Sequence, residues 1–580
     1  MKYLYRLLLA IALMIGGADS AAAQAGNWAW ARQAGGAGAD AGKGIGTDRA
    51  GHVYVGGVYQ QAAAFGSQRI AQAGTNGFPA KYDSAGTALW ARSIANSGLC
   101  SVEDIAVDPS GNAYLIGSFV GTATFGPASF TSVHTDSLLP DGFVVKLNPQ
   151  GVVQWAKHIE SSPFSSFQSI VPAAIRANAV GEVVICGGFE RELRLDTVRI
   201  RAQATAVSAF LLKFTPAGEV AWHAEVKSAE ISYATDIEVA DDGYIYTVGF
   251  VDGFATLVNA QSPSFPFYAI DRQSSAFLAF HRSTGRLSSG TQAAIGQGFS
   301  VAQSVASDQV GNVYLTGYFS GITTFTNNLL NPLTARLAGG EAFVVKLRRN
   351  RTEFVWERQS FGTFTSQGTA IAVDTAGTVY LSGSFGGQLT FDSVTTLVAA
   401  DTINAYLAAF DANSSTPRWA QAGGKCARYE LVPLALDRRR RLFITGQFTG
   451  STRIGGTGLP GNGGRPEVFL ARYDPARPLA LPPPVTGRGP LVVYPNPVSS
   501  HDPDARLLVM LPITSGFHGK AVRVRLLNAL GQPVASQQYL PEAMRSRTEL
   551  PLPLGILPAG LYSLVLEDAT RRWTQRLVIE

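Results

Sequence analysis

Hydrophobic and polar residues alternate in short runs along most of this chain, and one such run recurs. The stretch GNVYLTGYFSGITTF (311–325) has close counterparts in GNAYLIGSFVGTATF (111–125) and GTVYLSGSFGGQLTF (377–391). Alternation with a period of two and many β-branched and aromatic residues are typical of a β-strand. The Asp–Gly sequence before each run is typical of a tight turn that leads into the strand. The repeated phrase therefore predicts one strand of a recurring all-β unit.

A glycine inside the phrase marks each copy. There are seven copies, 61 to 70 residues apart, with the marker at Gly56, Gly117, Gly187, Gly249, Gly317, Gly383 and Gly446. A second apolar phrase follows in every copy, and most copies continue through a short turn to a strand with a tryptophan: Trp90, Trp155, Trp222, Trp356 and Trp419. Each copy thus offers four short strands, and seven such copies predict an all-β fold, a seven-bladed β-propeller.

The two ends of the repeat region complement each other. The segment NWAWARQAGG (27–36) is a tryptophan strand with no partner strands before it, and the seventh copy ends at Tyr473 without one. We expect the N-terminal strand to complete the last blade, which closes the ring and removes a sheet edge. Residues 27 to 474 also resemble the propeller repeats of secreted bacterial proteins, through the phrase D-x-x-G-N-x-Y-x-x-G-x-F at 108–119 and 308–319. That resemblance implies a fold and no reaction.

The N-terminus has the pattern of a secretory signal peptide. Lys2 and Arg6 precede an apolar run (7–15), and GGADSAAAQA (16–25) supplies small residues for cleavage. We place cleavage after Ala23, so residues 1–23 are the signal peptide and 24–474 the propeller. The apolar run is too short to cross a bilayer, and no later stretch is long enough, so we expect no transmembrane segment.

Composition changes at Pro475, where a proline-rich run (475–490) reads as a semi-rigid linker. The remaining residues, 491–580, predict a small β-sandwich. Its phrases VYPNP (493–497), VRLLNALGQPV (524–534), LPAGLYSLVL (557–566) and TQRLVIE (574–580) resemble the C-terminal sorting domain of type IX secretion. The resemblance places the motif on Tyr494, Pro495, Asn496, Pro497, Gly531, Gly560 and Tyr562.

This second resemblance carries implications for cellular location. It implies a Bacteroidota-type cell, the type IX secretion machinery as a partner, and a protein that is secreted or held on the outer cell surface. An ordinary accessory β-sandwich is the alternative.

Charge adds little to this picture. The net charge is +5, and the densest basic run is Arg438 to Arg441. An anionic partner is one explanation, but no aromatic residues interleave with the run as a nucleic-acid platform requires, so we favour a solvated turn and expect no nucleic-acid partner. The three cysteines fall in different repeats, which predicts no structural disulfide: Cys100, Cys186 and Cys426.

No catalytic constellation stands out. The histidines lack metal-ligand spacing, and the chain has neither a nucleophile elbow nor a phosphate loop, so we expect no catalytic residue, metal or cofactor. Departures from the repeat are the better candidates. Two copies carry an acid, Asp104 and Asp236, at a position on the innermost strand where the others do not. A carboxylate pair at the channel mouth is one hypothesis, and two solvated acids at strand starts is the other.

Loop lengths point to a binding face. The connections that follow the second and fourth strands vary most and lie on one face of the disc, where binding usually resides. Aromatic residues there include Phe265, Phe267 and Tyr268. We therefore predict a non-enzymatic binding or scaffold module for a glycan or a surface protein. A carbohydrate-active lyase or glycosidase built on a propeller is the alternative.

Overall fold

The computed structural model describes residues 27–475 and parts of 492–579 of the chain. Gaps in the description fall at 135–138, 166–168, 204–205, 260–261, 269–274, 293–294, 326–332, 338, 349–352, 392–395, 400–402, 427–431, 476–491, 495–505, 511–521, 529–531, 540–548, 554–556, 558–559 and 568–571. The chain divides into two compact parts, Met1–Pro475 and Ala476–Glu580, which are described separately.

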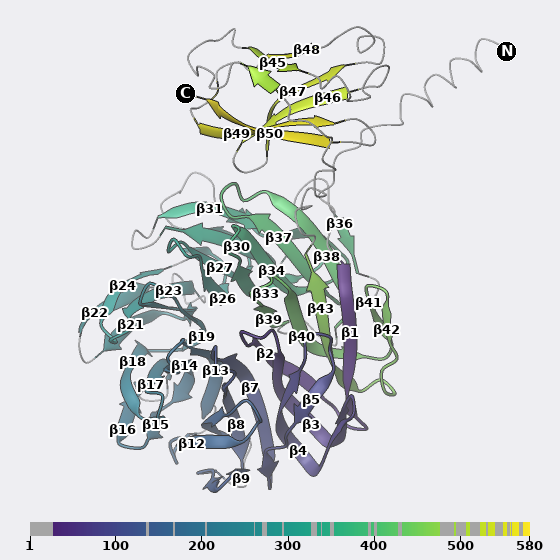
Figure 1. The fold of residues 1–580 in the computed structure, drawn as a ribbon. Helices are drawn as coiled ribbons and strands as arrows, with labels where there is room; N and C mark the ends of the chain where they lie inside the picture. Colours follow the sequence, from purple (N-terminus) through teal and green to yellow (C-terminus); the bar gives the residue numbers. More distant parts are fainter. Residues whose placement is uncertain are drawn as a thin grey trace, which may run out of the picture. The chain divides into compact units, whose positions relative to one another are not determined.

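The N-terminal part is built from four-stranded antiparallel sheets, here called repeat units, arranged around a common centre (Figure 1). Their inner strands, in chain order, are β2 (Ala41–Thr47), β7 (Leu99–Val107), β13 (Ile170–Ala177), β19 (Ser232–Val239), β26 (Ser300–Ser307), β33 (Ser366–Val373) and β39 (Leu434–Leu436). The second strands hold the marker glycines: β3 (Val53–Phe65), β8 (Ala113–Val120), β14 (Val183–Glu190), β20 (Tyr244–Val251), β27 (Val313–Phe319), β34 (Thr378–Phe385) and β40 (Leu442–Thr449).

The outer half of each unit carries the second phrase and the tryptophan strand. The third strands are β4 (Gln68–Tyr82), β11 (Asp141–Leu147), β17 (Val207–Phe214), β23 (Ser275–Arg282), β30 (Glu341–Leu347), β37 (Asn404–Asp411) and β43 (Pro466–Asp474). The fourth strands are β5 (Ala88–Ala91), β12 (Val153–Ile159), β18 (Val220–Ser228), β24 (Leu287–Gln292), β31 (Phe354–Gln359), β38 (Pro417–Lys425) and β1 (Asn27–Gly36). In the last unit the fourth strand comes from the other end of this part, because β1 pairs antiparallel with β43 from Asn27↔Asp474 to Ala34↔Val468.

A short hairpin follows the second strand in every unit, which the sequence did not predict. These hairpins are β9 (Thr122–Phe125) with β10 (Ala128–Thr131), β15 (Glu192–Leu195) with β16 (Val198–Arg201), β21 (Phe254–Asn259) with β22 (Ser262–Tyr268), β28 (Ile322–Thr324) with β29 (Leu333–Thr334), β35 (Gln388–Thr390) with β36 (Thr396–Val398), β41 (Thr452–Ile454) with β42 (Thr457–Leu459), and the outer ends of β3 and β4.

Most of the hairpins pair with the chain that leaves the preceding unit. Thus β21 pairs with β18, and three other hairpins pair with the short strands β6 (Ala95–Asn96), β25 (Ile295–Gln297) and β32 (Phe361–Gly362). The connections that we predicted to be variable loops therefore contain ordered strands that tie neighbouring units together.

A recurring contact, here called the latch, joins one unit to the next. The indole N–H of Trp90 donates to the carbonyl of Pro149 in the turn between the third and fourth strands of the next unit (3.1 Å), and Lys81 Nζ donates to the same oxygen (3.5 Å). The indole ring also lies on Gly151 of that turn, where a Cβ atom would come within 3.2 Å of it. A large apolar ring and two hydrogen bonds thus converge on one small turn.

The latch recurs with other residues at the same places. Further latches converge on the carbonyls of Pro216 (Trp155, Lys146), Ser283 (Trp222, Lys213), Ala412 (Trp356, Lys346) and Ser84 (Trp30, Arg472). The last of these joins the unit that contains β1 to the first unit, so the same contact operates between segments at opposite ends of the N-terminal part.

The C-terminal part contains two antiparallel sheets. One has the order β44 (Val492–Tyr494), β45 (Arg506–Met510) and β48 (Glu549–Pro553), and the other has β47 (Pro533–Tyr539), β46 (Val522–Leu527), β49 (Gly560–Glu567) and β50 (Arg572–Ile579). Leu552 from the first sheet joins Val524, Leu564 and Leu577 from the second in one buried cluster.

Two absences apply to the described residues. They include no helix of the length and apolarity that a membrane span requires. All three cysteines are buried and free, so the prediction of no structural disulfide is confirmed.

Candidate functional site

A bulge interrupts the inner strands at equivalent places. Against its second strand, each of the first six inner strands shifts register by one residue, for example between Val102 and Asp104 on β7. A bulge leaves the extra residue unpaired and re-aims its side chain. The extra residues, here called the bulge residues, are Lys43, Glu103, Ala173, Thr235, Gln303 and Thr369.

The bulge residues lie between two cavities at the centre of the inner strands. The inner cavity has a volume of about 420 Å³ and is lined by all seven inner strands, the first six of them from the bulge toward the end of the strand. The mouth cavity, of about 560 Å³, is lined mainly by the beginnings of the inner strands. Five bulge residues line both cavities: Lys43, Glu103, Ala173, Thr235 and Gln303. The bulges thus form a waist, and the mouth cavity lies on the side where the inner strands begin.

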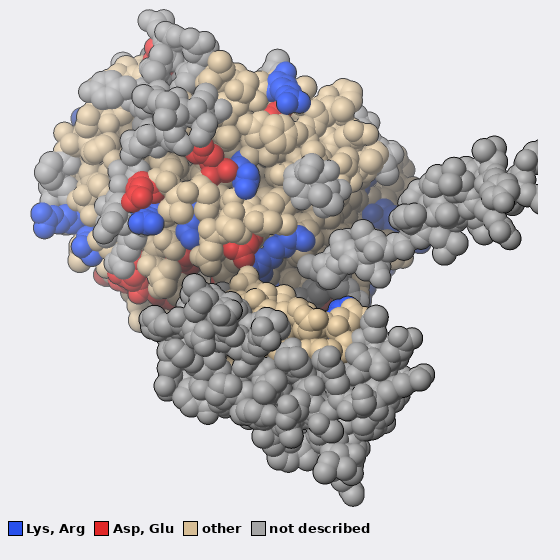
Figure 2. All heavy atoms as spheres, turned by 90° about the horizontal axis from the view of Figure 1, so that it is seen from above, with Lys and Arg blue, Asp and Glu red and all other residues tan. Residues whose placement is uncertain are grey.

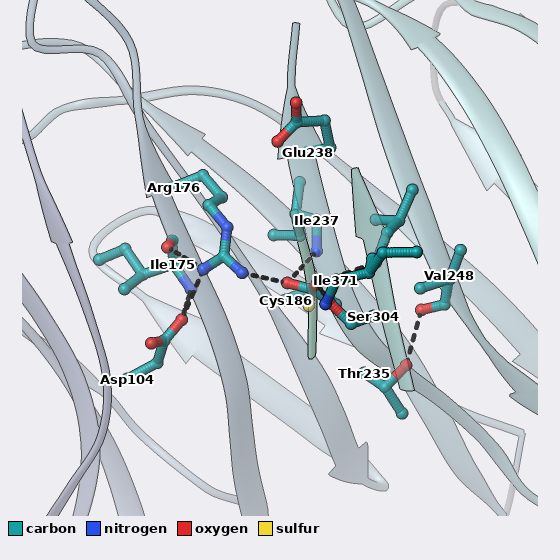
Figure 3. Close-up of polar contacts among 12 residues, drawn as sticks. Asp104, Ile175, Arg176, Cys186, Thr235, Ile237, Glu238, Val248, Ser304 and Ile371 are labelled. Carbon is teal, nitrogen blue, oxygen red and sulfur yellow. Dashed lines mark hydrogen bonds and ion pairs between the residues drawn. The ribbon is translucent and has the colours of Figure 1, made fainter. Parts of the chain in front are cut away.

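Asp104 and Asp236, predicted as a carboxylate pair, meet through a residue that the sequence did not single out. Arg176 on β13 donates from Nη1 to Asp104 Oδ2 (2.7 Å), as Figure 3 shows. From Nη2 it donates to Asp236 Oδ1 (2.5 Å). The guanidinium therefore bridges β7 and β19, the inner strands on either side of its own.

Backbone amides and a hydroxyl occupy the remaining acceptors of the two carboxylates. Asp104 accepts from the amides of Ile105 (2.8 Å) and Ile175 (3.0 Å). Asp236 Oδ2 accepts from Ser304 Oγ (2.6 Å) and the amide of Val305 (3.0 Å). Both acids are therefore parts of a clamp between inner strands, which neither of the two hypotheses from the sequence described.

Burial sets the electrostatics of this clamp. Burial raises the pKa of Asp104, and the charge of Arg176 opposes the rise. Burial also works to lower the pKa of Arg176, but the two aspartates outweigh it, so the pKa of this guanidinium lies above its ordinary value. Glu238, two residues after Asp236, has its pKa raised by burial, and its carboxylate accepts from Ser307 Oγ (2.8 Å). An acid that shares a guanidinium and several amides is poorly placed to exchange protons with a substrate.

One signal in the sequence marks Arg176. Its position on β13 corresponds in register to Ala106 on β7 and Ala306 on β26, as the pairing with the second strands shows. The same place holds glycine or alanine in three further units, at Gly46, Ala372 and Ala435, and glutamate in the fourth unit, at Glu238. A long charged side chain at a place that holds a small residue in five of the units is a departure from the repeat of the same kind as Asp104.

The predicted aromatic candidates lie in the hairpin β21–β22. Phe267 is 1% exposed and its ring packs on Phe277 (5.2 Å between centroids), so it belongs to the core and its side chain is not on the binding face, contrary to the expectation for this residue. Phe265 is half-buried beside Phe267 (5.4 Å). Tyr268 ends β22, and its side chain is outside the described residues.

The remaining predicted residues belong to the two ends of the chain. Tyr494 lies in β44, Gly560 begins β49, and Tyr562 is 6% exposed in the core of the C-terminal part. The other predicted positions lie outside the described residues: Ala23, Pro495, Asn496, Pro497 and Gly531.

The arginine run contributes two of its members to internal contacts. Arg440 Nε donates to Asp374 Oδ2 (2.6 Å) in the preceding unit, and Arg441 Nε donates to Asp437 Oδ2 (2.5 Å). Arg438 and Arg439 are exposed. Figure 2 shows one face of the molecule, on which basic and acidic side chains are interspersed and do not form a single basic patch. These features leave little basis for a polyanion site in the run.

Metal ligands do not gather in the described residues, where no group of three or more His, Cys, Asp or Glu side chains is placed to hold an ion.

Comparisons with known proteins agree with a propeller repeat. The model of the family described as "Beta-propeller repeat" matches residues 29–58. No curated protein sequence matches the chain. The chain therefore contains a β-propeller repeat within an all-β architecture.

Solved structures show only distant likeness. Quinohemoprotein alcohol dehydrogenase from Comamonas testosteroni has 10% identity and a TM-score of 0.35, over 78% of this chain and 77% of that one. Acylaminoacyl peptidase from Pyrococcus horikoshii has 9% identity and a TM-score of 0.36, over 82% of this chain and 58% of that one, so the match spans less than two thirds of the peptidase. NanB sialidase from Streptococcus pneumoniae has 9% identity and a TM-score of 0.31, over 78% and 69%.

Proposed function

We propose that the repeat region is a seven-bladed β-propeller closed between β1 and β43, and that it works outside the cell as a non-enzymatic binding or scaffold module. The latch from Trp30 and Arg472 to the carbonyl of Ser84 supports the closure, because it repeats between the last and first units the contact that joins other neighbours. Each four-stranded sheet needs a neighbour on both faces to bury its side chains, and a ring supplies one.

One observation carries the binding role. The acids at the centre are engaged in the clamp with Arg176, whereas the mouth cavity above them is lined by bulge residues that differ from unit to unit. The backbone bulge is the same in these units, but the side chain that it presents to the cavity differs from unit to unit. The repeated backbone therefore sets the shape of the cavity, and the different side chains can recognise a ligand. This arrangement supports a role in binding.

Export is proposed from the sequence of the two ends. Residues 1–23 have the pattern of a signal peptide, and the phrases of the C-terminal part resemble a type IX sorting domain. We propose that the secretion machinery of a Bacteroidota-type cell delivers the protein to the outer surface or the medium. Cell fractionation tests this, since deletion of 491–580 should leave the protein in the periplasm. Equal delivery of the truncated protein would contradict the sorting role.

The binding role is tested with the mature full-length protein. We expect it to be retained on immobilised polysaccharides or on outer-surface fractions of cells, without the release of new reducing ends or unsaturated sugars. Product formation during the same incubation would contradict the non-enzymatic assignment and favour a lyase or glycosidase. Absence of retention on every matrix would contradict the binding role.

A further inference from the structure

The mouth cavity has the dimensions and lining of a small-ligand site. Its volume of about 560 Å³ falls within the range of about 300–1,000 Å³ that is usual for such sites. Most of its wall is apolar, with a few polar side chains that come from different units. The nature of that lining restricts which ligand can bind there.

Charge at the mouth is balanced. Lys43 Nζ and Glu103 Oε2 form an ion pair of 2.7 Å, and their side chains are 35% and 24% exposed. Both groups thus face the cavity as a donor and an acceptor with no net charge. An ionic ligand would have to break this pair or bring an uncompensated charge into a partly desolvated space.

The inner cavity below the waist disfavours anions further. Three carboxylates line it there, from Asp104, Asp236 and Glu238, against the single guanidinium of Arg176. With Lys43 and Glu103 included, the lining has four acids and two bases, which leaves a net charge of −2. A sulfated or uronic acid ligand would therefore approach a negative potential.

Two aromatic rings form part of the wall. Tyr233 on β19 and Phe250 on β20 lie 5.5 Å apart with an interplanar angle of 36°. The amides of Gln303 and Gln447 line the same cavity and offer both donors and acceptors. Apolar ring surface beside neutral donors and acceptors matches a molecule with an apolar C–H face and many hydroxyl groups.

We propose that the mouth cavity binds the end of an uncharged oligosaccharide, with sugar C–H groups against Tyr233 and Phe250 and hydroxyl groups on Lys43, Glu103 and the amides. The inference rests on the proposed binding function and adds the site and the class of ligand. Hydroxyl groups both donate to the carboxylate and accept from the ammonium, so a sugar uses the ion pair without breaking it.

The test titrates the mature protein with three panels of oligosaccharides. The neutral panel contains gluco-, manno- and xylo-oligosaccharides, the anionic panel contains uronic acid oligomers, and the cationic panel contains glucosamine oligomers. We expect binding to at least one neutral member by calorimetry, and weaker binding of its anionic counterpart by about tenfold or more.

Two variants locate the site. Ala173→Trp fills the waist without removing a polar contact and should abolish binding of the neutral ligand. Glu103→Gln keeps the shape but leaves Lys43 unpaired, so it should weaken the neutral ligand by about tenfold and strengthen the anionic one. Asp196→Asn is the matched control, because Asp196 forms a similar ion pair with Lys157 (2.7 Å) outside both cavities, and it should bind like the unmodified protein.

The outcomes separate this inference from the proposed function. Binding of a neutral oligosaccharide that survives both mouth variants places the site elsewhere, which overturns the inference and leaves the binding role intact. Binding of charged oligomers alone overturns the ligand class. Failure to bind any of the three panels overturns the inference as well, and the retention assay on cell-surface fractions then decides separately whether the binding role stands. Thermal melting of each variant shows whether a loss of binding reflects loss of the fold.

Discussion

The latches and the bulge residues are two sets of contacts that recur from unit to unit, but they differ in what recurs. In a latch both the backbone and the side chains repeat, since a tryptophan and a basic residue reach a carbonyl in the next unit at Pro149, Pro216, Ser283, Ala412 and Ser84. At the bulges only the backbone repeats. The side chains there run from Lys43 and Glu103 to Ala173 and Gln303.

This difference separates the information for shape from the information for recognition. A latch has to satisfy the same geometry at every interface, so its residues are alike. A bulge has only to aim a side chain at the centre, so its residue is free to differ. Changes to a latch should therefore affect stability most, and changes at the centre should affect stability only where charges are buried.

The largest effect is expected from the latch. Trp90→Ala removes a ring that is 7% exposed and packs on Gly151, and we expect a loss of about 3–5 kcal/mol in the free energy of unfolding. Trp90→Phe keeps most of the ring but loses the hydrogen bond to Pro149, and should cost about 1 kcal/mol. Urea titration of the full-length protein measures both.

The neighbouring residue supplies the control for this prediction. Leu89 on the same strand is 43% exposed, and Leu89→Ala should change stability by less than about 0.5 kcal/mol. A Trp90→Ala variant as stable as Leu89→Ala would show that the latch does not hold neighbouring units together.

The clamp at the centre comes next. Arg176→Met leaves Asp104 and Asp236 without their counter-charge, and we expect a loss of about 3 kcal/mol at pH 7, at the low end for a broken buried pair because the Arg176 side chain is 32% exposed. Burial already raises the pKa of Asp104, and loss of Arg176 raises it further. A folded-state pKa above the unfolded one favours the folded state as pH falls, so the deficit should shrink toward pH 4.

Urea titrations at pH 7 and pH 4 test this sign. The triple variant Arg176→Met, Asp104→Asn, Asp236→Asn removes all three charges and should recover much of the loss at pH 7. Arg199→Met, at an exposed position on β16, is the matched single change and should be nearly neutral. A deficit that grows at low pH would mean that Arg176 does not hold Asp104 in its charged form.

Most of the fold, and part of the clamp at the centre of the inner strands, could be predicted from the sequence. The marker glycines and the tryptophans identified the strands of the repeat units, because alternation and turn residues are local signals. The hairpins were missed, since most of their strands have only two to four residues, which is too short to show alternation. Asp104 and Asp236 stood out as departures from the repeat.

The contact that joins those two acids depends on how neighbouring units pack, and no local sequence pattern shows which residues of different units come close together. Arg176 was missed because its partners lie on neighbouring inner strands, 72 and 60 residues away. The bulges were missed because the extra residue can be of any type, as Lys43 and Ala173 show.

A third prediction concerns an interruption of the repeat in the outer layer. His281 on β23 is fully buried, and at the equivalent place in other units the residue is apolar or aromatic, as at Leu147 and Phe214. Burial lowers the pKa of His281 to about 4. The unfolded chain takes up the proton near the ordinary pKa of 6.5, so stability should fall as pH drops from 6.5 toward 4.

The variant His281→Phe should remove this dependence. Relative to its value at pH 8, the stability of the unmodified protein should decline by about 2 kcal/mol more than that of the variant at pH 5. Urea titrations at the two pH values measure the difference. Identical pH profiles for the two proteins would show that His281 does not titrate with unfolding.

The smallest effect is expected at Arg440, where the last unit replaces the turn glycine of the others. Arg440 has a φ of 64°, a conformation that favours glycine, and its guanidinium donates to Asp374 and Tyr380 of the preceding unit. Arg440→Gly loses a charge-assisted hydrogen bond, worth about 2 kcal/mol, but relieves about 1 kcal/mol of backbone strain, so the net loss should be about 1 kcal/mol. Arg440→Ala loses the same bond and keeps the strain, so it should cost about 2 kcal/mol by urea titration. If Arg440→Ala were as stable as Arg440→Gly, the positive φ at this position would cost no measurable strain. The hydrogen bonds of the Arg440 side chain alone would then account for the departure from the repeat.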